Sequence, residues 1–277
     1  MGEIIQRTPG SAIFVREKQT LQFGLDARIS GVFQCEMSDP EAIVQVLNAG
    51  RVATTGLYAD LRAIGLPAAT AYGLIEDLLT HGIFEYCSTH PIQIIGRGEI
   101  FERINELCTH PANLSFEITH AGEDESIMQY LVRGRHDVPL VLAVDNGMRR
   151  DYAAGLRGYE TVIPVTHIDG QGIIGPLRLR HAGPCVLCSY FHRCQRDPLW
   201  REVLQAAPFP GEIDPASAYA TAAYAFAIIQ GLYQHHVGPG IHLENPRPGQ
   251  VIRVTSQRNH TKIMQTHPLC PECHGYS

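Results

Sequence analysis

The chain has 277 residues, of which 44% are hydrophobic and 18% are charged, and its formal net charge at pH 7 is −6. This length suffices for one large domain or two modest ones with a substantial core. An acidic chain without a basic stripe or a local Lys/Arg cluster does not fit a nucleic-acid-binding or membrane-surface protein. We therefore expect neither nucleic acid nor membrane among its partners.

The first residues, MGEIIQRTPGSAIF, lack a positive region followed by an apolar run, so we expect no signal peptide and a cytoplasmic location. In a reducing compartment, paired cysteines are more often metal ligands or redox groups than disulfides. Two CxxC pairs account for four of the eight cysteines. We interpret Cys35, Cys87 and Cys108, outside these pairs, as small buried apolar residues.

Residues 1–90 form the first predicted domain. Leu21, Phe23 and Leu25 alternate, and a turn leads to Gly31-Val32-Phe33, which together predict a strand pair. Three helices follow, beginning after the caps Asp39, Thr55 and Pro67 and ending at Gly50, Gly65 and Gly82. A strand over 83–86 completes a winged-helix-like module.

The third helix of this module decides between DNA and peptide as its ligand. A DNA-reading helix needs Lys or Arg to contact phosphates. This helix carries Glu76 and Asp77 and no basic residue. We therefore expect peptide or protein recognition, and a winged-helix regulator with a zinc domain is the weaker alternative.

Residues 91–277 form the second predicted domain, of α/β type. Short apolar runs predict strands over 92–95, 114–118, 140–144 and 159–165, and the segments between them have helical periodicity. Such alternation favours a parallel sheet. A long helix over 215–235 and a hairpin over 251–264 follow, separated by a Pro/Gly-rich loop.

The two CxxC pairs are Cys185–Cys188 and Cys270–Cys273. A two-residue gap lets both sulfurs of one turn face the same ion, and two such turns supply four thiolates in a tetrahedron. Four thiolates leave no open position, so we expect a structural zinc ion that clasps distant parts of the chain. The alternatives are a thioredoxin-type redox pair and an iron–sulfur cluster. Neighbouring side chains that could replace a ligand are His192, Cys194, His267 and His274.

A glycine-rich turn, Gly96-Arg97-Gly98, follows a predicted strand and begins a helix, which is the context of a phosphate-binding loop. The third glycine of that fingerprint falls on Phe101, and no Walker lysine is present. Asp145, at the end of a predicted strand, is a candidate Mg²⁺ ligand or a turn cap. The fingerprint is incomplete, and a structural role is the preferred interpretation of these residues.

Several segments carry a family resemblance. They are LQFGLDARISGVFQ near the N-terminus, GPLRLRHAGPCVLCSYFHRCQRDPLW around the first CxxC pair, and HPLCPEC around the second. With the incomplete glycine-rich turn and the strand that ends in an aspartate, the chain resembles ThiF-type proteins related to ubiquitin-activating enzymes. More narrowly, it is similar to the ocin-ThiF-like group found with cyclodehydratases of azol(in)e-containing ribosomal peptides, such as bacteriocins.

The resemblance implies a Rossmann-like ThiF-type domain behind a module that binds a precursor (leader) peptide as an added strand beside a helix. Catalytic relatives adenylate a carboxylate. By position, the residues for this reaction would be Gly96, Gly98, Arg97 or Arg103, and Asp145. Three departures favour a non-catalytic scaffold: the third glycine is missing, the end of the second strand lacks the expected acidic residue because Glu117 lies mid-strand, and no transfer cysteine is recognisable.

The scaffold would present its peptide to a separate YcaO-type enzyme, and ThiF-type proteins commonly form homodimers. The small residues of the helix over 215–235 are a candidate dimer face, although burial in the chain's own core explains them equally well. The alternative function is an ATP-dependent adenylyltransferase, with ATP and Mg²⁺ as cofactors.

Overall fold

The computed structural model describes residues 3–35, 39–110, 115–122, 125–145, 147–206, 213–233, 236–238 and 241–274. It is a mixed α/β chain, as expected, and it divides into two compact units. The first comprises Met1–Thr89 with Tyr233–Glu244, and the second comprises His90–Leu232 with Asn245–Ser277. Within the described ranges, no helix combines the length and the apolar character needed to cross a membrane.

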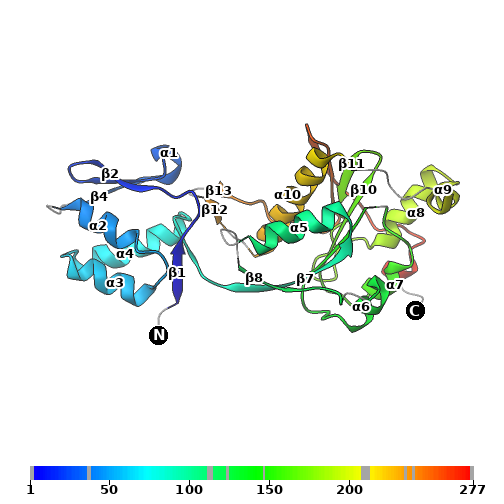
Figure 1. The fold of residues 1–277 in the computed structure, drawn as a ribbon, viewed down its shortest axis with the longest axis horizontal. Helices are drawn as coiled ribbons and strands as arrows, with labels where there is room; N and C mark the ends of the chain where they lie inside the picture. The colour runs from blue at the N-terminus through cyan, green and yellow to red at the C-terminus, as the bar shows by residue number, and fades with distance from the viewer. Residues whose placement is uncertain are drawn as a thin grey trace. The chain divides into compact units, whose positions relative to one another are not determined.

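The first unit contains two three-stranded antiparallel sheets, in the orders β5-β1-β6 and β2-β3-β4. Its elements are β1 (Ile4–Arg7), β2 (Ile13–Glu17), β3 (Thr20–Phe23), α1 (Ala27–Ser30), β4 (Val32–Gln34), α2 (Pro40–Leu47), β5 (Val52–Ala53), α3 (Thr54–Ala63), α4 (Ala68–Thr80), β6 (Phe84–Tyr86) and the hairpin of β12 (His236–Gly238) and β13 (Ile241–His242) (Figure 1).

The predicted strand pair is confirmed, because β3 and β4 pair antiparallel with Leu21 opposite Phe33. Phe23 is buried in the core of this unit, whereas Leu25 lies beyond the end of β3 and is 87% exposed. The alternation of apolar residues therefore ends two positions earlier than the sequence indicated. Strands β1 and β2, which extend the two sheets, were not predicted.

The helices of the first unit follow the prediction with one correction. The Asp39 carboxylate accepts a hydrogen bond from the Ala42 amide at 3.4 Å and caps α2, as expected. Thr55, in contrast, lies inside α3 and is not its cap. Strand β5 runs directly into α3 through an extended Ala53, and the Thr54 amide donates to the Glu3 carbonyl at 2.9 Å. Pairing with the N-terminal strand thus replaces the side-chain cap.

The second unit is built on a sheet of seven strands in the order β15-β14-β11-β10-β9-β7-β8. Its strands are β7 (Thr89–Arg97), which begins at the boundary of the units, β8 (Ser115–Thr119), β9 (Leu140–Val144), β10 (Val162–Ile168), β11 (Gln171–Ile174), β14 (Gln250–Val254) and β15 (Asn259–Ile263). Its helices are α5 (Glu99–Thr109), α6 (Ile127–Arg133), α7 (Tyr152–Leu156), α8 (Val186–Arg196), α9 (Trp200–Ala206), α10 (Pro215–Leu232) and α11 (Pro271–His274).

The sheet is only partly parallel, which corrects the prediction of a parallel sheet. Strands β7, β9 and β10 are parallel, whereas β10, β11, β14 and β15 are joined as antiparallel neighbours. The reversal occurs at Asp169-Gly170, where both residues have positive φ and turn β10 back into β11. The predicted strand over 140–144 and the terminal hairpin are confirmed. Of the strand predicted over 114–118, residue 114 lies outside the described residues.

Helices cover both faces of this sheet (Figure 1). Ile95 of β7 and Leu142 of β9 are register partners and share a core with Tyr130 of α6 and Leu156 of α7. Because side chains alternate along a strand, Ile94 faces the opposite side, where α5 and α10 pack together. The second unit is thus a three-layer α/β/α arrangement.

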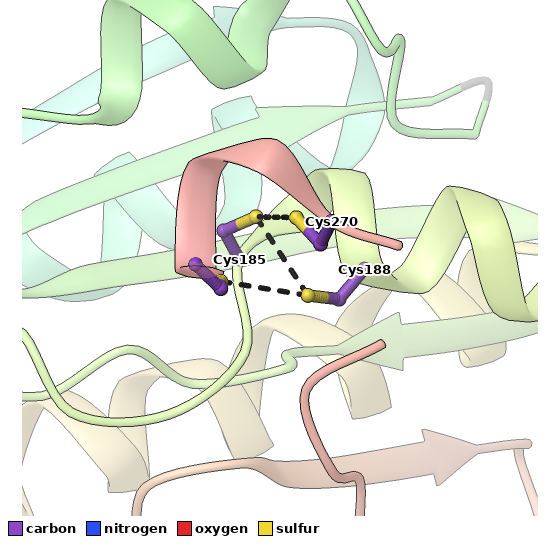
Figure 2. A group of neighbouring side chains, drawn as sticks. Cys185, Cys188 and Cys270 are labelled. Atoms are coloured by element: carbon purple, nitrogen blue, oxygen red, sulfur yellow. Dashed lines mark hydrogen bonds between the residues drawn. The ribbon is translucent and has the colours of Figure 1, made fainter. Parts of the chain in front are cut away.

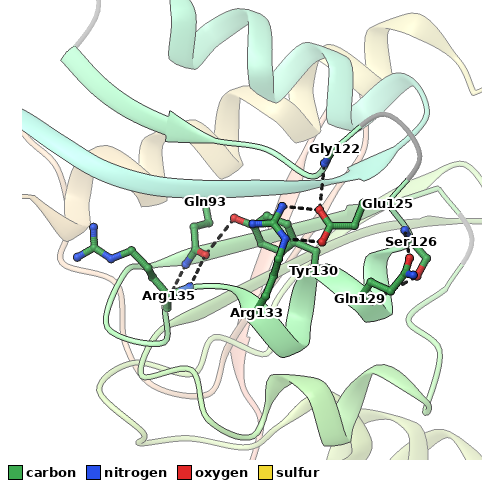
Figure 3. Close-up of polar contacts among 8 residues, drawn as sticks. All are labelled: Gln93, Gly122, Glu125, Ser126, Gln129, Tyr130, Arg133 and Arg135. Carbon is green, nitrogen blue, oxygen red and sulfur yellow. Dashed lines mark hydrogen bonds and ion pairs between the residues drawn. The ribbon is translucent and has the colours of Figure 1, made fainter.

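One buried amide attaches α6 to the sheet. Gln93 of β7 is 2% exposed, and its Nε2 donates to the carbonyls of Arg135 at 2.7 Å and Val138 at 2.9 Å. Its Oε1 accepts from the Arg135 amide and from the Tyr130 hydroxyl, both at 3.0 Å (Figure 3). All four hydrogen-bonding positions of this buried side chain are therefore used, which offsets the cost of burying it.

The N-terminus of α6 is fixed by its own sequence. Ser126 and Gln129 form a capping box, with hydrogen bonds of 3.2 and 2.8 Å (Figure 3). Glu125 pairs with Arg133 and accepts from the Gly122 amide at 3.0 Å. The pKa of Glu125 is consequently lowered, chiefly by its hydrogen bond to Arg133.

The long predicted helix is α10, and most of its small residues are buried within the chain, whereas Ala216 and Ala223 are exposed. Ala218, Ala222 and Ala225 are fully covered, and α10 contacts α5 and β11. A Cβ on Gly172 of β11 would lie 1.9 Å from the Thr221 hydroxyl oxygen, so this glycine permits the close approach. The buried small residues thus serve this helix's own packing.

Candidate metal centre

Each CxxC pair lies at the start of a helix. Cys185 caps α8 and Cys188 lies in its first turn, while Cys270 precedes α11 and Cys273 lies within it. The amide of the second cysteine donates to the carbonyl of the first in both pairs, at 3.1 Å in α8 and 3.3 Å in α11. The same local turn therefore directs two sulfurs to one side in each pair.

The two turns face one another across 82 residues of sequence, and their four sulfurs lie within 4.8 Å of each other. The Sγ–Sγ distances are 3.9 Å for Cys185–Cys188, 3.5 Å for Cys185–Cys270 and 3.5 Å for Cys188–Cys273 (Figure 2). In Figure 2, the three labelled side chains converge on one point between α8 and the C-terminal helix.

These distances fit a metal tetrahedron and exclude disulfides. Two sulfurs bound to one zinc ion at about 2.3 Å lie about 3.8 Å apart in a tetrahedron. A disulfide needs about 2.05 Å, and all eight cysteines are free. Four thiolates with no other ligand are one of the donor sets of structural zinc sites. The cluster can therefore hold a metal ion such as zinc.

The surroundings of the sulfurs favour neutral thiols as long as no cation is bound. Three of the cysteines are buried, and Leu187 and Phe191 pack against them. Burial raises the pKa of Cys270 to about 11, and the hydrogen bond to Cys188 together with burial also raises the pKa of Cys185. Thiolates therefore form here only when a cation compensates their charge, and metal binding would release protons.

The alternative ligands lie outside the tetrahedron. Among the described residues, the only His/Cys/Asp/Glu group with metal-binding spacing is the four cysteines. His192 contacts the Gln265 carbonyl at 3.0 Å, and its ring packs against that of His267. The two rings border the site but do not enter it.

An ion pair, which the sequence did not indicate, fixes α11. Glu272, between the two cysteines of the second pair, lies 2.7 Å from Arg157 at the end of α7. The Glu272 oxygen involved makes no hydrogen bond of acceptable angle, so the contact is an electrostatic one. It connects the C-terminal turn to α7 as well as to α8.

The second candidate site, the glycine-rich turn, joins β7 to α5 as predicted. Both glycines are required by the fold. A Cβ at Gly96 would lie 1.8 Å from the Ala143 carbonyl oxygen of the adjacent strand, and one at Gly98, where φ is +95°, would lie 1.5 Å from Asp145 Oδ2. The glycines therefore admit a neighbouring strand and a neighbouring carboxylate.

The structure brings Asp145 to the N-terminus of α5. Its Oδ2 accepts a hydrogen bond from the Glu99 amide at 3.2 Å, and Oδ1 is buried without a hydrogen-bond partner in the described part of the chain. Burial raises the pKa of Asp145, and the backbone hydrogen bonds from Glu99 and Ile100 oppose that rise. A carboxylate thus lies where a phosphate-binding loop would direct its amides toward a phosphate.

The arginines of this region differ in their pairing. Arg103 is engaged by Glu99 at 2.7 Å and by Glu106 at 3.1 Å, and its guanidinium lies over the Tyr219 ring. Arg97, at the end of β7, is exposed. Phe101, at the position of the missing third glycine, packs edge-on against His120.

Comparison with known proteins shows relatives of the fold only among solved structures. No protein-family model and no curated protein matches the chain. A chain of the E. coli microcin synthetase McbBCD complex with pro-MccB17 bound is 14% identical with a TM-score of 0.60, over 97% of this chain and 99% of that one.

Two heterocyclase structures are similar at the same level. The heterocyclase TruD is 13% identical with a TM-score of 0.59, over 98% of this chain and 43% of its own. A heterocyclase in complex with substrate and cofactor is 13% identical with a TM-score of 0.60, over 98% of this chain and 39% of its own. This chain therefore spans about two fifths of these heterocyclases. At identities this low, the TM-scores show a shared fold alone.

Proposed function

We propose that the protein is a zinc-containing, ThiF-like scaffold that binds a precursor peptide through its winged-helix-like first unit and presents it to a separate YcaO-type cyclodehydratase. The observation that carries the proposal is the end-to-end likeness to one chain of a synthetase complex that has a precursor peptide, pro-MccB17, bound. That likeness covers both units of the chain.

The glycine-rich turn supports a role without adenylation. A nucleotide phosphate at the N-terminus of α5 would have to displace the Asp145 carboxylate, which already accepts the Glu99 amide. The incoming phosphate would also meet the negative charges of Asp145 and Glu99. We therefore assign no catalytic step to Gly96, Gly98 and Asp145.

The first unit offers an edge for peptide addition. In the sheet order β2-β3-β4, the outer edge of β4 has no partner strand among the described residues. Leu25, Ile29 and Val32, around this edge, are exposed apolar residues, as is Tyr72 of α4. Exposed apolar side chains beside an unpaired edge fit a peptide that adds as a strand and inserts alternate side chains.

The zinc ion would have a structural role in this proposal. Cys185, Cys188, Cys270 and Cys273 would hold it, with no position left for substrate. It would tie the C-terminal turn to α8 and so fix the strands that precede that turn. The proposed homodimer would use the exposed side of α10, where Ala216 and Ala223 lie, and light scattering after size-exclusion chromatography would test it.

The proposal is tested with synthetic precursor peptides taken from short reading frames beside the gene. We expect one of them to bind and to protect the amides of β4 from hydrogen exchange. Val32→Asp should weaken binding at least about tenfold without unfolding, because Val32 is 48% exposed. The matched control is Val203→Asp in α9, where the side chain is 46% exposed and peptide affinity should not change.

The adenylyltransferase alternative predicts a different result. It requires ATP–pyrophosphate exchange that depends on a peptide carboxylate and is lost in Asp145→Ala. We expect no exchange in either protein. Peptide-dependent exchange that disappears in Asp145→Ala would replace the scaffold by an enzyme, whatever the outcome of the peptide-binding experiment.

A further inference from the structure

Four cationic side chains gather in the second unit, away from the cysteine cluster's sulfurs and the glycine-rich turn. Arg193 and Arg196 lie on α8, Arg253 lies on β14 and Lys262 lies on β15. All four line one small, shallow hollow that is open to solvent. The sequence gives no hint of this cluster, because the residues come from two segments some 60 residues apart and neither segment is a basic run.

Strand register explains why the cations meet. Ile173 of β11 is opposite Arg253 of β14, and Val251 is opposite Lys262 of β15. Since side chains alternate along each strand, Arg253, Val251 and Lys262 lie on one face of the sheet. Arg193 and Arg196 of α8 line the same hollow from the helix side.

The cluster has no ion-pair partner in the described part of the chain, and Asp169 offsets its charge only in part. Among the described residues, none of the four cations forms an ion pair, although every ion pair elsewhere in the described chain uses an arginine. Asp197, next to Arg196 in sequence, accepts a hydrogen bond from the Leu199 amide at 3.0 Å. The chain as a whole is acidic, so four unpaired cations in one place are a local exception.

The cations repel one another. Burial and then Arg253, Arg196 and Arg193 lower the pKa of Lys262. Burial and then Arg253 and Arg196 also lower the pKa of Arg193, and Asp169 only partly compensates. Such an arrangement destabilises the protein without a ligand, and an anion in the hollow would remove the repulsion.

We infer that this hollow is a binding site for a phosphate-bearing anion, held by Arg193, Arg196, Arg253 and Lys262. A single carboxylate would leave most of the positive charge uncompensated, whereas phosphate and pyrophosphate carry several negative charges. Three of the four cations are arginines, whose planar guanidinium donates two parallel hydrogen bonds to phosphate oxygens. Ser189 lines the hollow and offers a hydroxyl.

An adjacent hollow indicates what else the ligand could carry. It shares Ile173, Gly175, Ser189 and Arg193 with the cationic hollow and extends to Trp200, whose ring packs under the Arg193 guanidinium at 4.8 Å. The phosphate could therefore come from a free anion or from a nucleotide whose base occupies the Trp200 side. Both sources share the same phosphate chemistry at the four cations.

The test is calorimetry of the zinc-loaded protein with sodium pyrophosphate in a low-salt buffer free of phosphate, with zinc content measured afterwards. We expect one pyrophosphate per chain and an affinity that falls with salt. The double variant Arg253→Gln/Lys262→Gln should bind at least about tenfold more weakly, since charge-assisted hydrogen bonds are lost. The matched control is Arg258→Gln, an exposed arginine at the turn of the same hairpin, which should change affinity by less than about twofold.

Titrations with ATP and with hexaglutamate distinguish the ligands. Tighter binding of ATP than of pyrophosphate, lost in Trp200→Ala, would identify a nucleotide, while equal binding would identify a free phosphate anion. Absence of pyrophosphate binding at millimolar concentration, equal affinity in the double variant, or tighter binding of hexaglutamate would overturn the inference.

A second measurement does not depend on the choice of ligand. In anion-free buffer, Lys262→Gln should raise the Tm, because it removes one repelling charge from a half-buried position. Pyrophosphate should then stabilise the wild type more than the variant. A lower Tm for Lys262→Gln without any anion would mean that these cations support the fold by themselves, contrary to the inference.

Discussion

The cysteine cluster and the glycine-rich turn are both short motifs that suggested a bound cofactor, yet the structure treats them differently. The four sulfurs converge at distances that suit a metal ion and leave each thiol without a better partner. At the glycine-rich turn, the space beside Gly98 already contains the Asp145 carboxylate. The cysteine cluster offers four donors to a metal ion, whereas at the glycine-rich turn a carboxylate of the protein occupies the place of a ligand.

The difference lies in what each motif needs beyond its local turn. A CxxC turn is complete within four residues, so a second such turn is enough to predict four donors. A phosphate loop needs open space at the start of a helix, and that depends on neighbouring strands. Gly96 leaves space for the adjacent strand, and Gly98 leaves space for the Asp145 carboxylate. Sequence spacing does not reveal these contacts.

The largest expected effect is on the cysteine cluster. Cys185→Ser should reduce bound zinc from one per chain to none and destabilise the second unit by more than about 4 kcal/mol, because metal binding is coupled to folding. Elemental analysis and thermal unfolding measure both. The control is Cys194→Ser on the same helix, outside the cluster, which should keep its zinc and nearly its full stability. An unchanged Tm for Cys185→Ser would refute the structural role.

Acid should release the metal by competition between protons and zinc for the same sulfurs. The thiol of Cys270 has a pKa raised to about 11 by burial, so a free thiol here holds its proton strongly. Lowering the pH therefore favours the protonated, metal-free cluster. The pH dependence of zinc release should be steeper the more thiolates take up a proton. A zinc-sensitive dye follows the release. If release proved independent of pH, thiolate ligation would be wrong.

Secondary structure that depends on a few neighbouring residues could be predicted from the sequence. The strand pair at Leu21–Phe33, the cap Asp39 and the strand Leu140–Val144 are each coded within a few residues, and all are present. Strand β11, which joins β10 to the predicted hairpin in antiparallel order, was missed because the tight turn at Asp169-Gly170 cannot be told from a longer loop in the sequence.

The cationic hollow shows the same limit for sites. Arg193, Arg253 and Lys262 are isolated charges in sequence, and only the order β11-β14-β15 and the position of α8 bring them together. An acidic overall composition indicated no such cluster. Sites whose members share one turn are therefore visible in the sequence, whereas those assembled by strand order are not.

A smaller effect is expected from Gly98→Ala. The new Cβ would lie in a left-handed backbone conformation and 1.5 Å from Asp145 Oδ2, so we expect a loss of about 2–3 kcal/mol in the free energy of unfolding. The matched control is Gly170→Ala, where φ is also positive, at +76°, but no atom lies within 4 Å. The control should lose only about 1 kcal/mol. Equal losses would show that Asp145 does not occupy the space beside Gly98.

The smallest and most discriminating effect is expected from Asp145→Asn. Burial raises the pKa of this carboxyl above its value in the unfolded chain, so ionisation costs more in the folded state. The associated stability is present below the unfolded pKa, near 4, and is lost as the pH rises through the folded value. Asparagine keeps an oxygen for the Glu99 amide but carries no charge.

The difference in unfolding free energy should therefore shift in favour of Asp145→Asn as the pH rises from about 4 to neutrality, by at most about 1 kcal/mol. Denaturant unfolding at several pH values measures it. A shift in the opposite direction would mean that the folded protein stabilises the carboxylate, as a bound cation at Asp145 would, and the glycine-rich turn would then resemble the cysteine cluster as a site that awaits a metal.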